Sequence, residues 1–123
     1  MEIYLVEDSP MVLERLEGML AGVPGAHVAG CAARADQAIR DIVAGRPDVA
    51  IVDLKLAQGS GFDVLRAVRE AAPDIDVYML SNFASEPYRR LAERLGARDF
   101  FDKSGEFQRV RDMVVHRAAT VAA

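Results

Sequence analysis

Five polar residues of this sequence follow apolar runs of the kind that form β-strands. Glu7 and Asp8 follow a first run, and Asp53 follows a run of four residues that is apolar at every position. Ser81 and Lys103 closely follow two later runs. If these runs are parallel strands of one open α/β sheet, their carboxyl ends meet along one edge, which is where such sheets bind ligands. We therefore expect three acids, a hydroxyl and an ammonium to converge on one site.

The residue types expected at this site favour magnesium-dependent phosphate chemistry. Three neighbouring carboxylates repel one another unless a cation compensates their charge. Carboxylate and carbonyl oxygens suit Mg²⁺, with Mn²⁺ as an alternative, and Mg²⁺ leaves coordination positions free for a phosphoryl oxygen. Once the metal and Lys103 neutralise the transferring group, Asp53 is a competent nucleophile toward phosphorus. Ser81 can then donate a hydrogen bond to the new phosphoryl group.

The elements that must position these residues alternate along the chain. Short β-branched and aliphatic runs alternate with stretches of helical periodicity, which predicts an α/β fold with a doubly wound, five-stranded parallel sheet. Ser9 and Pro10 are suited to begin the first helix, and Gly61 precedes the third. The Ala-rich residues 117–123 are expected to fray. The expected strands are 3–6, 27–32, 49–52, 75–80 and 98–101.

Composition and charge narrow the class of protein. With 51% apolar and 28% charged residues among 123, the chain is expected to be one globular domain, residues 1–123. A net charge of -4 argues against nucleic-acid binding by this chain alone, and no apolar run is long enough to span a membrane. The lone Cys31 fits a reducing cytoplasm and is expected to be buried. His27 and His116 have no partner at ligand spacing and are expected at the surface.

Several segments together resemble the receiver domains of response regulators in two-component signalling systems. The resemblance covers nearly the whole chain, and its specificity lies in the shared order and spacing of the segments. It implies the flavodoxin-like (βα)5 receiver fold with strand order 2-1-3-4-5. The segments are Leu5-Val6-Glu7-Asp8-Ser9, Val49 to Leu54, Gly59-Ser60-Gly61, Leu80-Ser81 and Gly96 to Lys103.

The resemblance assigns roles at the acidic end of the site. It implies that Asp53 takes a phosphoryl group from a sensor histidine kinase or a phosphotransfer protein. It also implies that Asp8, Asp53 and the backbone carbonyl of Lys55 bind Mg²⁺, while Glu7 assists through water. The chain would then be a phosphoacceptor switch with at most self-catalysed phosphorylation and dephosphorylation, and not a conventional enzyme.

The resemblance also implies how the signal leaves the site. Lys103 would pair with the phosphoryl group, Ser81 would swing toward it, and Phe100 would turn inward. These movements would couple the site to a surface made by the fourth helix, the fifth strand and the fifth helix, as a shift between two packings. A downstream protein or a fused output domain would read that surface, and homodimerisation on activation is open.

The sequence departs from the commonest receiver pattern at several positions. Ala57 and Ser104 stand where proline is frequent, so the cis peptide that is common after the lysine need not form at Lys103. Lys55 and Phe83 occupy positions that flank the phosphoryl group in relatives and affect the access of hydrolytic water. We expect these two side chains to tune the rate at which the phosphoryl group is lost and to favour a long-lived phosphoryl state.

Rival functions predict different residues. An aspartate-nucleophile phosphatase places a second aspartate two residues after the first, where this chain has Lys55. A flavin-binding module needs a phosphate loop rich in glycine and hydroxyls after the first strand, which Asp8-Ser9-Pro10-Met11 is not. Two alternatives stay open: an interaction domain that ignores phosphate, and the receiver part of a DNA-binding transcriptional regulator.

Overall fold

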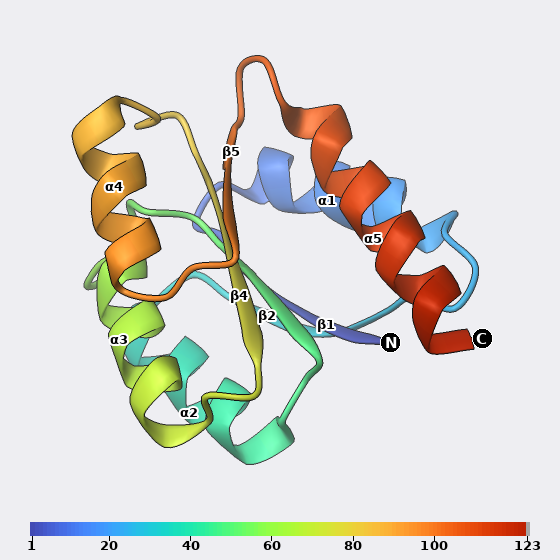
Figure 1. The fold of residues 1–123 in the computed structure, drawn as a ribbon, viewed down its shortest axis with the longest axis horizontal. Coiled ribbons are helices and arrows are strands. Elements are labelled where there is room, and N and C mark those ends of the chain that lie inside the picture. Colours follow the sequence, from blue (N-terminus) through green and yellow to red (C-terminus); the bar gives the residue numbers. More distant parts are fainter. Residues whose placement is uncertain (123) are drawn as a thin grey trace.

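The computed structural model describes residues 1–122, and a parallel five-stranded sheet forms its centre (Figure 1). The strand order is β2-β1-β3-β4-β5, and every neighbouring pair is parallel. The predicted fold class and strand order are therefore confirmed, and the strand bounds differ from the expected ones by at most one residue. The strands are β1 (Glu2–Val6), β2 (His27–Ala32), β3 (Val49–Val52), β4 (Asp76–Ser81) and β5 (Asp99–Asp102).

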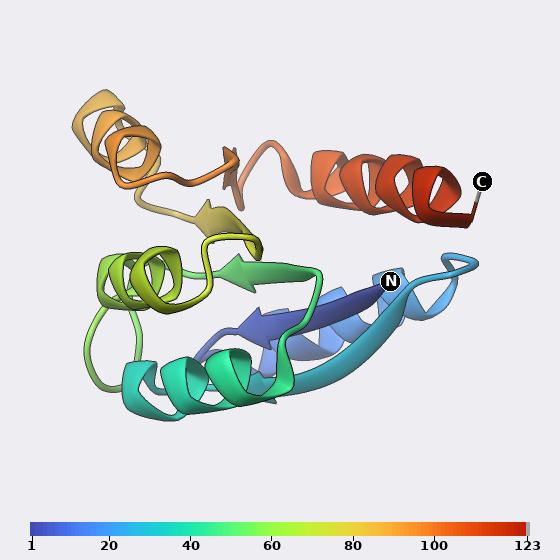
Figure 2. The same cartoon turned by 60° about the horizontal axis from the view of Figure 1, so that its bottom comes forward.

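Helices cover both faces of the sheet, as Figure 2 shows from a turned view. Helices α1 and α5 pack on one face, and α2, α3 and α4 pack on the other. Among residues 1–122 no helix combines the length and the apolar character needed to cross a membrane. The helices are α1 (Pro10–Ala21), α2 (Ala35–Gly45), α3 (Gly61–Ala71), α4 (Glu86–Arg94) and α5 (Phe107–Ala122).

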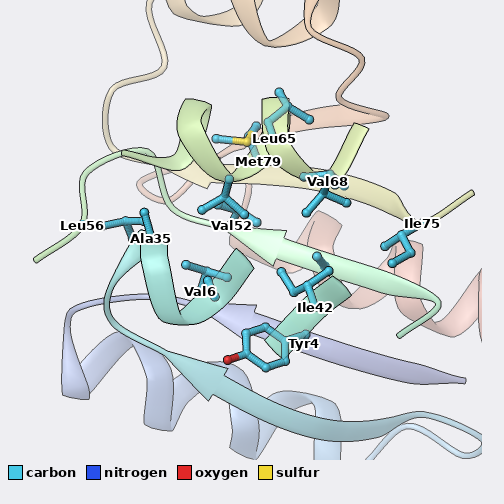
Figure 3. Packing of buried hydrophobic residues seen from close by; sticks show 14 of the residues in the cluster. Tyr4, Val6, Ala35, Ile42, Val52, Leu56, Leu65, Val68, Ile75 and Met79 are labelled. Carbon is cyan, nitrogen blue, oxygen red and sulfur yellow. The ribbon is translucent and has the colours of Figure 1, made fainter. Parts of the chain in front are cut away.

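The central strand β3 has no exposed position, because each of its faces is covered by helices. Val49 and Ile51 belong to the buried cluster under α1 and α5, whereas Ala50 and Val52 belong to the cluster under α2, α3 and α4. Figure 3 shows Val52 in the second cluster, among side chains from α2, α3 and the neighbouring strands. A strand buried on both faces is held firmly, so the residue that follows it has a well-defined position.

The structure adds to one expectation about an individual segment and corrects another. Residues 117–122 belong to α5, and Arg117 pairs with Asp76 at 2.8 Å and donates to the Tyr78 hydroxyl at 3.1 Å. Fraying of residues 117–123 stays a prediction, and residue 123 lies outside the described residues. Cys31 is exposed rather than buried, because β2 is an edge strand whose side chains alternate between exposed and partly covered. An alternating pattern of apolar residues does not ensure burial in an edge strand, because an edge strand is less covered than a central strand.

Both histidines lie where the sequence predicts. His27 and His116 are exposed. The ring nitrogen Nδ1 of His27 lies 2.8 Å from a carboxylate oxygen of Glu2, and both side chains face solvent. A surface pair of this kind contributes little to stability.

Candidate functional site

The sheet delivers two carboxylates to the same edge, one from each central strand. The backbone ladder continues one residue past each strand: the Glu7 N–H donates to the Ala32 carbonyl at 2.9 Å, and the Asp53 N–H donates to the Val6 carbonyl at 2.8 Å. Both side chains are buried, with Glu7 3% and Asp53 6% exposed. The backbone therefore fixes where these carboxylates project.

Lys103 joins the two carboxylates. Its Nζ lies 2.7 Å from Oε1 of Glu7 and 2.9 Å from Oδ2 of Asp53, and its side chain is only 9% exposed. Burial raises the pKa of Glu7 above its ordinary value, against the opposing hydrogen bond from Lys103. Burial by itself would lower the pKa of Lys103, but the hydrogen bonds to both carboxylates outweigh it and raise that pKa. Lys103 is therefore held as an ammonium between two carboxylates.

Asp8 completes an acidic group at the mouth of the site. Unlike its two neighbours it is exposed, yet oxygens of Glu7, Asp8 and Asp53 all lie within 4.8 Å of one another. When all are ionised, three carboxylates and one ammonium leave two negative charges in this space. An all-oxygen donor set with that excess charge fits a hard divalent cation such as Mg²⁺.

The remaining carboxylate oxygens are held by backbone groups. Oδ1 of Asp53 accepts from the Leu54 N–H at 2.7 Å, and Oε2 of Glu7 accepts from the Ser9 N–H at 3.1 Å. Ser9 also caps α1 by accepting from the Val12 N–H at 3.4 Å, as its position before Pro10 predicts. The start of α1 therefore orients Glu7 as well as ending the loop.

A pocket of about 230 Å³ lies over these groups and contains nearly all the residues singled out in the sequence. Ser81 is fully buried in it: its Oγ accepts from the Phe83 N–H at 3.1 Å, and its carbonyl accepts from the Lys103 N–H at 3.1 Å. Lys55 lines the rim and is exposed, as is Phe83. The seven predicted residues that line the pocket are Glu7, Asp8, Asp53, Lys55, Ser81, Phe83 and Lys103.

Phe100 is the predicted residue that does not line the pocket. It is 5% exposed and packs in the buried cluster with Ala92 of α4. The guanidinium of Arg89 lies 5.2 Å from the centre of its ring. Phe100 thus occupies an inward position beneath α4, one strand away from Ser81.

The structure adds pocket residues that the sequence did not single out, namely Ser9, Val12 and Asn82. It also shows why the loop after Asp53 returns closely: the Gly61 N–H donates to the Leu54 carbonyl at 2.7 Å. A Cβ on Gly61 would lie 2.2 Å from the Asp53 carbonyl oxygen. The peptide bond between Lys103 and Ser104 is not cis, and neither is any other bond within residues 1–122.

Comparison with known proteins places this site in context. The family model described as the response regulator receiver domain matches residues 3–115. The chain is 31% identical over 85 residues to the DNA-binding transcriptional activator DevR/DosR of Mycobacterium tuberculosis, covering 69% of this chain and 39% of that protein. It is 30% identical over 111 residues to a protein-glutamate methylesterase/protein-glutamine glutaminase of Carboxydothermus hydrogenoformans, covering 89% and 32%. The chain thus spans less than half the length of these curated relatives.

Solved structures share the whole fold. The response regulator domain of Thermotoga maritima CheB has a TM-score of 0.85 at 23% identity, covering 98% of this chain and 94% of that one. A two-component response regulator of the LuxR family from Aurantimonas sp. SI85-9A1 has a TM-score of 0.88 at 24% identity, covering 97% and 85%. At these identities the likeness is one of fold.

Proposed function

Because the chain belongs to the response regulator receiver domain family, we propose that residues 1–123 act as one receiver in phosphorelay signal transduction, with Asp53 as the phosphoacceptor. The observation that carries this proposal is the contact of one buried ammonium with both Asp53 and Glu7, beside a third carboxylate. The phosphoryl group comes from a sensor histidine kinase or a phosphotransfer protein.

The donor set fits Mg²⁺, which we assign to Asp8, Asp53 and the backbone carbonyl of Lys55, with Glu7 acting through water. When bound, the metal neutralises charge on the transferring phosphoryl group and orients it. Mn²⁺ fits the same oxygens. The three carboxylate groups gather within one small space, which supports this assignment.

The protein's own residues supply the rest of the transfer. A carboxylate oxygen of Asp53 attacks phosphorus while the bond to the donor's leaving group breaks, and Lys103 neutralises the charge that develops on the phosphoryl oxygens. Ser81 donates its hydroxyl hydrogen to one of those oxygens after its Oγ releases the Phe83 N–H.

The same movement of Ser81 explains how the state of Asp53 reaches the surface. The backbone of Ser81 pairs with the strand that carries Phe100, and Phe100 is packed beneath α4. We propose that phosphorylation shifts the packing of Ser81 and Phe100 together and so changes the surface of α4, β5 and α5. A downstream protein, a fused output domain or a second copy of the chain reads that surface.

A beryllofluoride titration tests this function. In wild-type protein with Mg²⁺, the phosphomimetic should shift the backbone amide resonances of Ser81, Phe100 and Lys103, because it occupies the pocket and repacks α4. The Asp53→Asn variant, whose side chain is a neutral amide in place of the nucleophilic carboxylate, should show none of these shifts. Shifts that stop at the pocket would exclude the switch, and no shift in the wild type would favour the alternative of an interaction domain that ignores phosphate.

The relatives suggest two kinds of target for this receiver. One relative is a DNA-binding transcriptional activator and another is a methylesterase, and each is longer than this chain. A receiver that regulates a DNA-binding domain is therefore the second candidate, alongside a receiver that acts by contact with a separate protein. In both cases the target would contact the same surface, that of α4, β5 and α5, which beryllofluoride is expected to change.

We further propose that Lys55 and Phe83 prolong the phosphoryl state. Phe83 is 45% exposed at the pocket rim and packs edge-on against Tyr88, with ring centres 6.2 Å apart. A bulky ring and a long cation at this rim hinder the approach of hydrolytic water. The decay of phosphorylated Asp53 should be faster in Phe83→Ala than in the wild type; a wild-type half-life of seconds, unchanged by the substitution, contradicts the proposal.

A further inference from the structure

Arg89 of α4 contacts three separate segments with three different nitrogens. Its Nε donates to the carbonyl of Ala84, in the loop that follows β4, at 2.8 Å. Its Nη1 donates to the carbonyl of Phe100 in β5 at 3.0 Å, and its Nη2 donates to Oε1 of Glu106 at 2.8 Å. The side chains of Arg89 and Glu106 are 32% and 26% exposed. Arg89 therefore ties the loop after Ser81 to the loop between β5 and α5.

Glu106 passes this connection to the backbone next to Lys103. The same Oε1 that binds Arg89 accepts from the Asp102 N–H at 2.9 Å, and the Glu106 N–H donates to the Asp102 carbonyl at 2.7 Å. The bond from Arg89, followed by that from the Asp102 N–H, lowers the pKa of Glu106 to about 2. Glu106 is thus a carboxylate at neutral pH, and it is hydrogen-bonded to both the N–H and the carbonyl of Asp102.

The residue after Lys103 is held as well. Oδ1 of Asp102 accepts from the Ser104 N–H at 2.9 Å and from the Ser104 hydroxyl at 2.7 Å. Lys103 itself donates its N–H to the carbonyl of Ser81. The backbone on both sides of Lys103 is therefore fixed by hydrogen bonds, and those that Glu106, Asp102 and Ser104 form involve no side chain that lines the pocket.

A lysine needs such support if its ammonium is to sit in one place. Its charge lies at the end of a flexible four-carbon stem, and holding that stem in one geometry costs conformational entropy. A misplacement of about 1 Å at a reacting centre can cost about 100-fold in rate. The Nζ of Lys103 contacts both Glu7 and Asp53 at once, and a fixed Cα position leaves fewer side-chain geometries that would break these contacts.

We infer that Arg89 and Glu106 are positioning residues that act on phosphoryl transfer through Lys103, by clamping the loop before it to the loop after Ser81. This inference rests on the proposed function, because the reaction it concerns is phosphorylation of Asp53. Neither residue lines the pocket. The effect of Glu106 reaches the reaction through the backbone that carries Lys103, and Arg89 connects that backbone to the loop after Ser81.

The test measures the rate at which acetyl phosphate and Mg²⁺ phosphorylate Asp53 in variants of the whole chain. Glu106→Ala should lower this rate about tenfold, because Lys103 is displaced by less than the roughly 1 Å that can cost about 100-fold. Glu106→Gln, which keeps an acceptor oxygen for the Asp102 N–H and for Arg89, should recover most of the rate. Glu86→Ala is the matched control, because it breaks an exposed arginine pair of the same helix, Arg90 to Glu86 at 3.4 Å.

A double-variant comparison separates positioning from general damage. In a Lys103→Met background, Glu106→Ala should cause no further loss of rate, since its effect passes through Lys103. A tenfold loss in both backgrounds, or a wild-type rate in Glu106→Ala, overturns the inference. If Glu106→Ala does not fold, Arg89→Lys carries the same comparison, because it keeps the charge but has one nitrogen in place of three.

Amide resonances keep the inference separate from the proposed function. Glu106→Ala should shift the amides of Phe83 and Lys103 in protein without phosphate, whereas Glu86→Ala should not. If wild-type protein is never phosphorylated, the proposed function fails while this measurement still decides whether the clamp exists. Unshifted Phe83 and Lys103 amides overturn the inference in either case.

Discussion

Replacing Lys103 by methionine should both slow the phosphorylation of Asp53 and destabilise the protein in the absence of Mg²⁺. The rate should fall by about 100- to 1000-fold, the loss that follows removal of one charge-stabilising donor from a reaction site. The free energy of unfolding should fall by about 3–5 kcal/mol, because two buried carboxylates lose their shared counter-charge. Glu7 and Asp53 lie within 2.9 Å of the ammonium, so neither can find another partner without moving.

The other lysine of the chain provides the control. Lys55 lines the same pocket but is exposed and forms no ion pair within the described residues. Lys55→Met removes the same charge and should change the free energy of unfolding by less than about 0.5 kcal/mol, as exposed substitutions usually do. Urea unfolding and acetyl phosphate kinetics measure both variants. Equal effects of the two substitutions would contradict the prediction, because they would show that the loss of one positive charge matters and the buried contact of Lys103 does not.

Adding one methyl group at Gly61 should disturb the site from beneath. A Cβ there would lie 2.2 Å from the Asp53 carbonyl oxygen and 2.9 Å from Cε of Met79. The Met79 side chain can move, but the Asp53 carbonyl belongs to the backbone that positions the nucleophile. We expect Gly61→Ala to lower the free energy of unfolding by about 3 kcal/mol, at the upper end of overpacking effects. Phosphorylation should slow as well, because Asp53 has to shift.

The same substitution at Gly18 should have the opposite effect on the free energy of unfolding. It lies within α1 and a Cβ there would have no neighbour within 4 Å. Gly18→Ala should raise the free energy of unfolding by about 0.5–1 kcal/mol, because alanine loses less backbone entropy in a helix. Denaturant unfolding of the two variants checks the pair. A stable, active Gly61→Ala protein would show that the loop after Asp53 is not fixed as described.

Much of the fold was predictable because periodicity carries it. Four consecutive apolar residues before Asp53 can only be satisfied where both faces of a strand are covered, and β3 is that strand. The parallel arrangement then brings the ends of β1, β3, β4 and β5 to one edge. The strand pattern alone therefore predicts which residues gather there, namely Glu7, Asp8, Asp53, Ser81 and Lys103.

Other features depend on contacts that periodicity does not encode. Cys31 looks like a core residue, yet its strand lies at the sheet edge, and edge position is set by strand order. Residues 117–122 look like a loose tail, yet Arg117 is held by Asp76 and Tyr78 from another element. Arg89 and Glu106 are 17 residues apart in the sequence. They meet because α4 packs beside the end of β5. Side chains at such distances leave no local pattern.

The most direct measurement is the intact mass of the protein after incubation with acetyl phosphate and Mg²⁺, with the modified peptide then identified by fragmentation. We expect the mass to increase by a single phosphoryl group, located at Asp53. The increase should not occur when the metal is chelated before acetyl phosphate is added, and it should not occur in Asp53→Asn protein. An unmodified wild-type chain, or an increment of equal size in Asp53→Asn, would contradict the claim that Asp53 is the phosphoacceptor of this site.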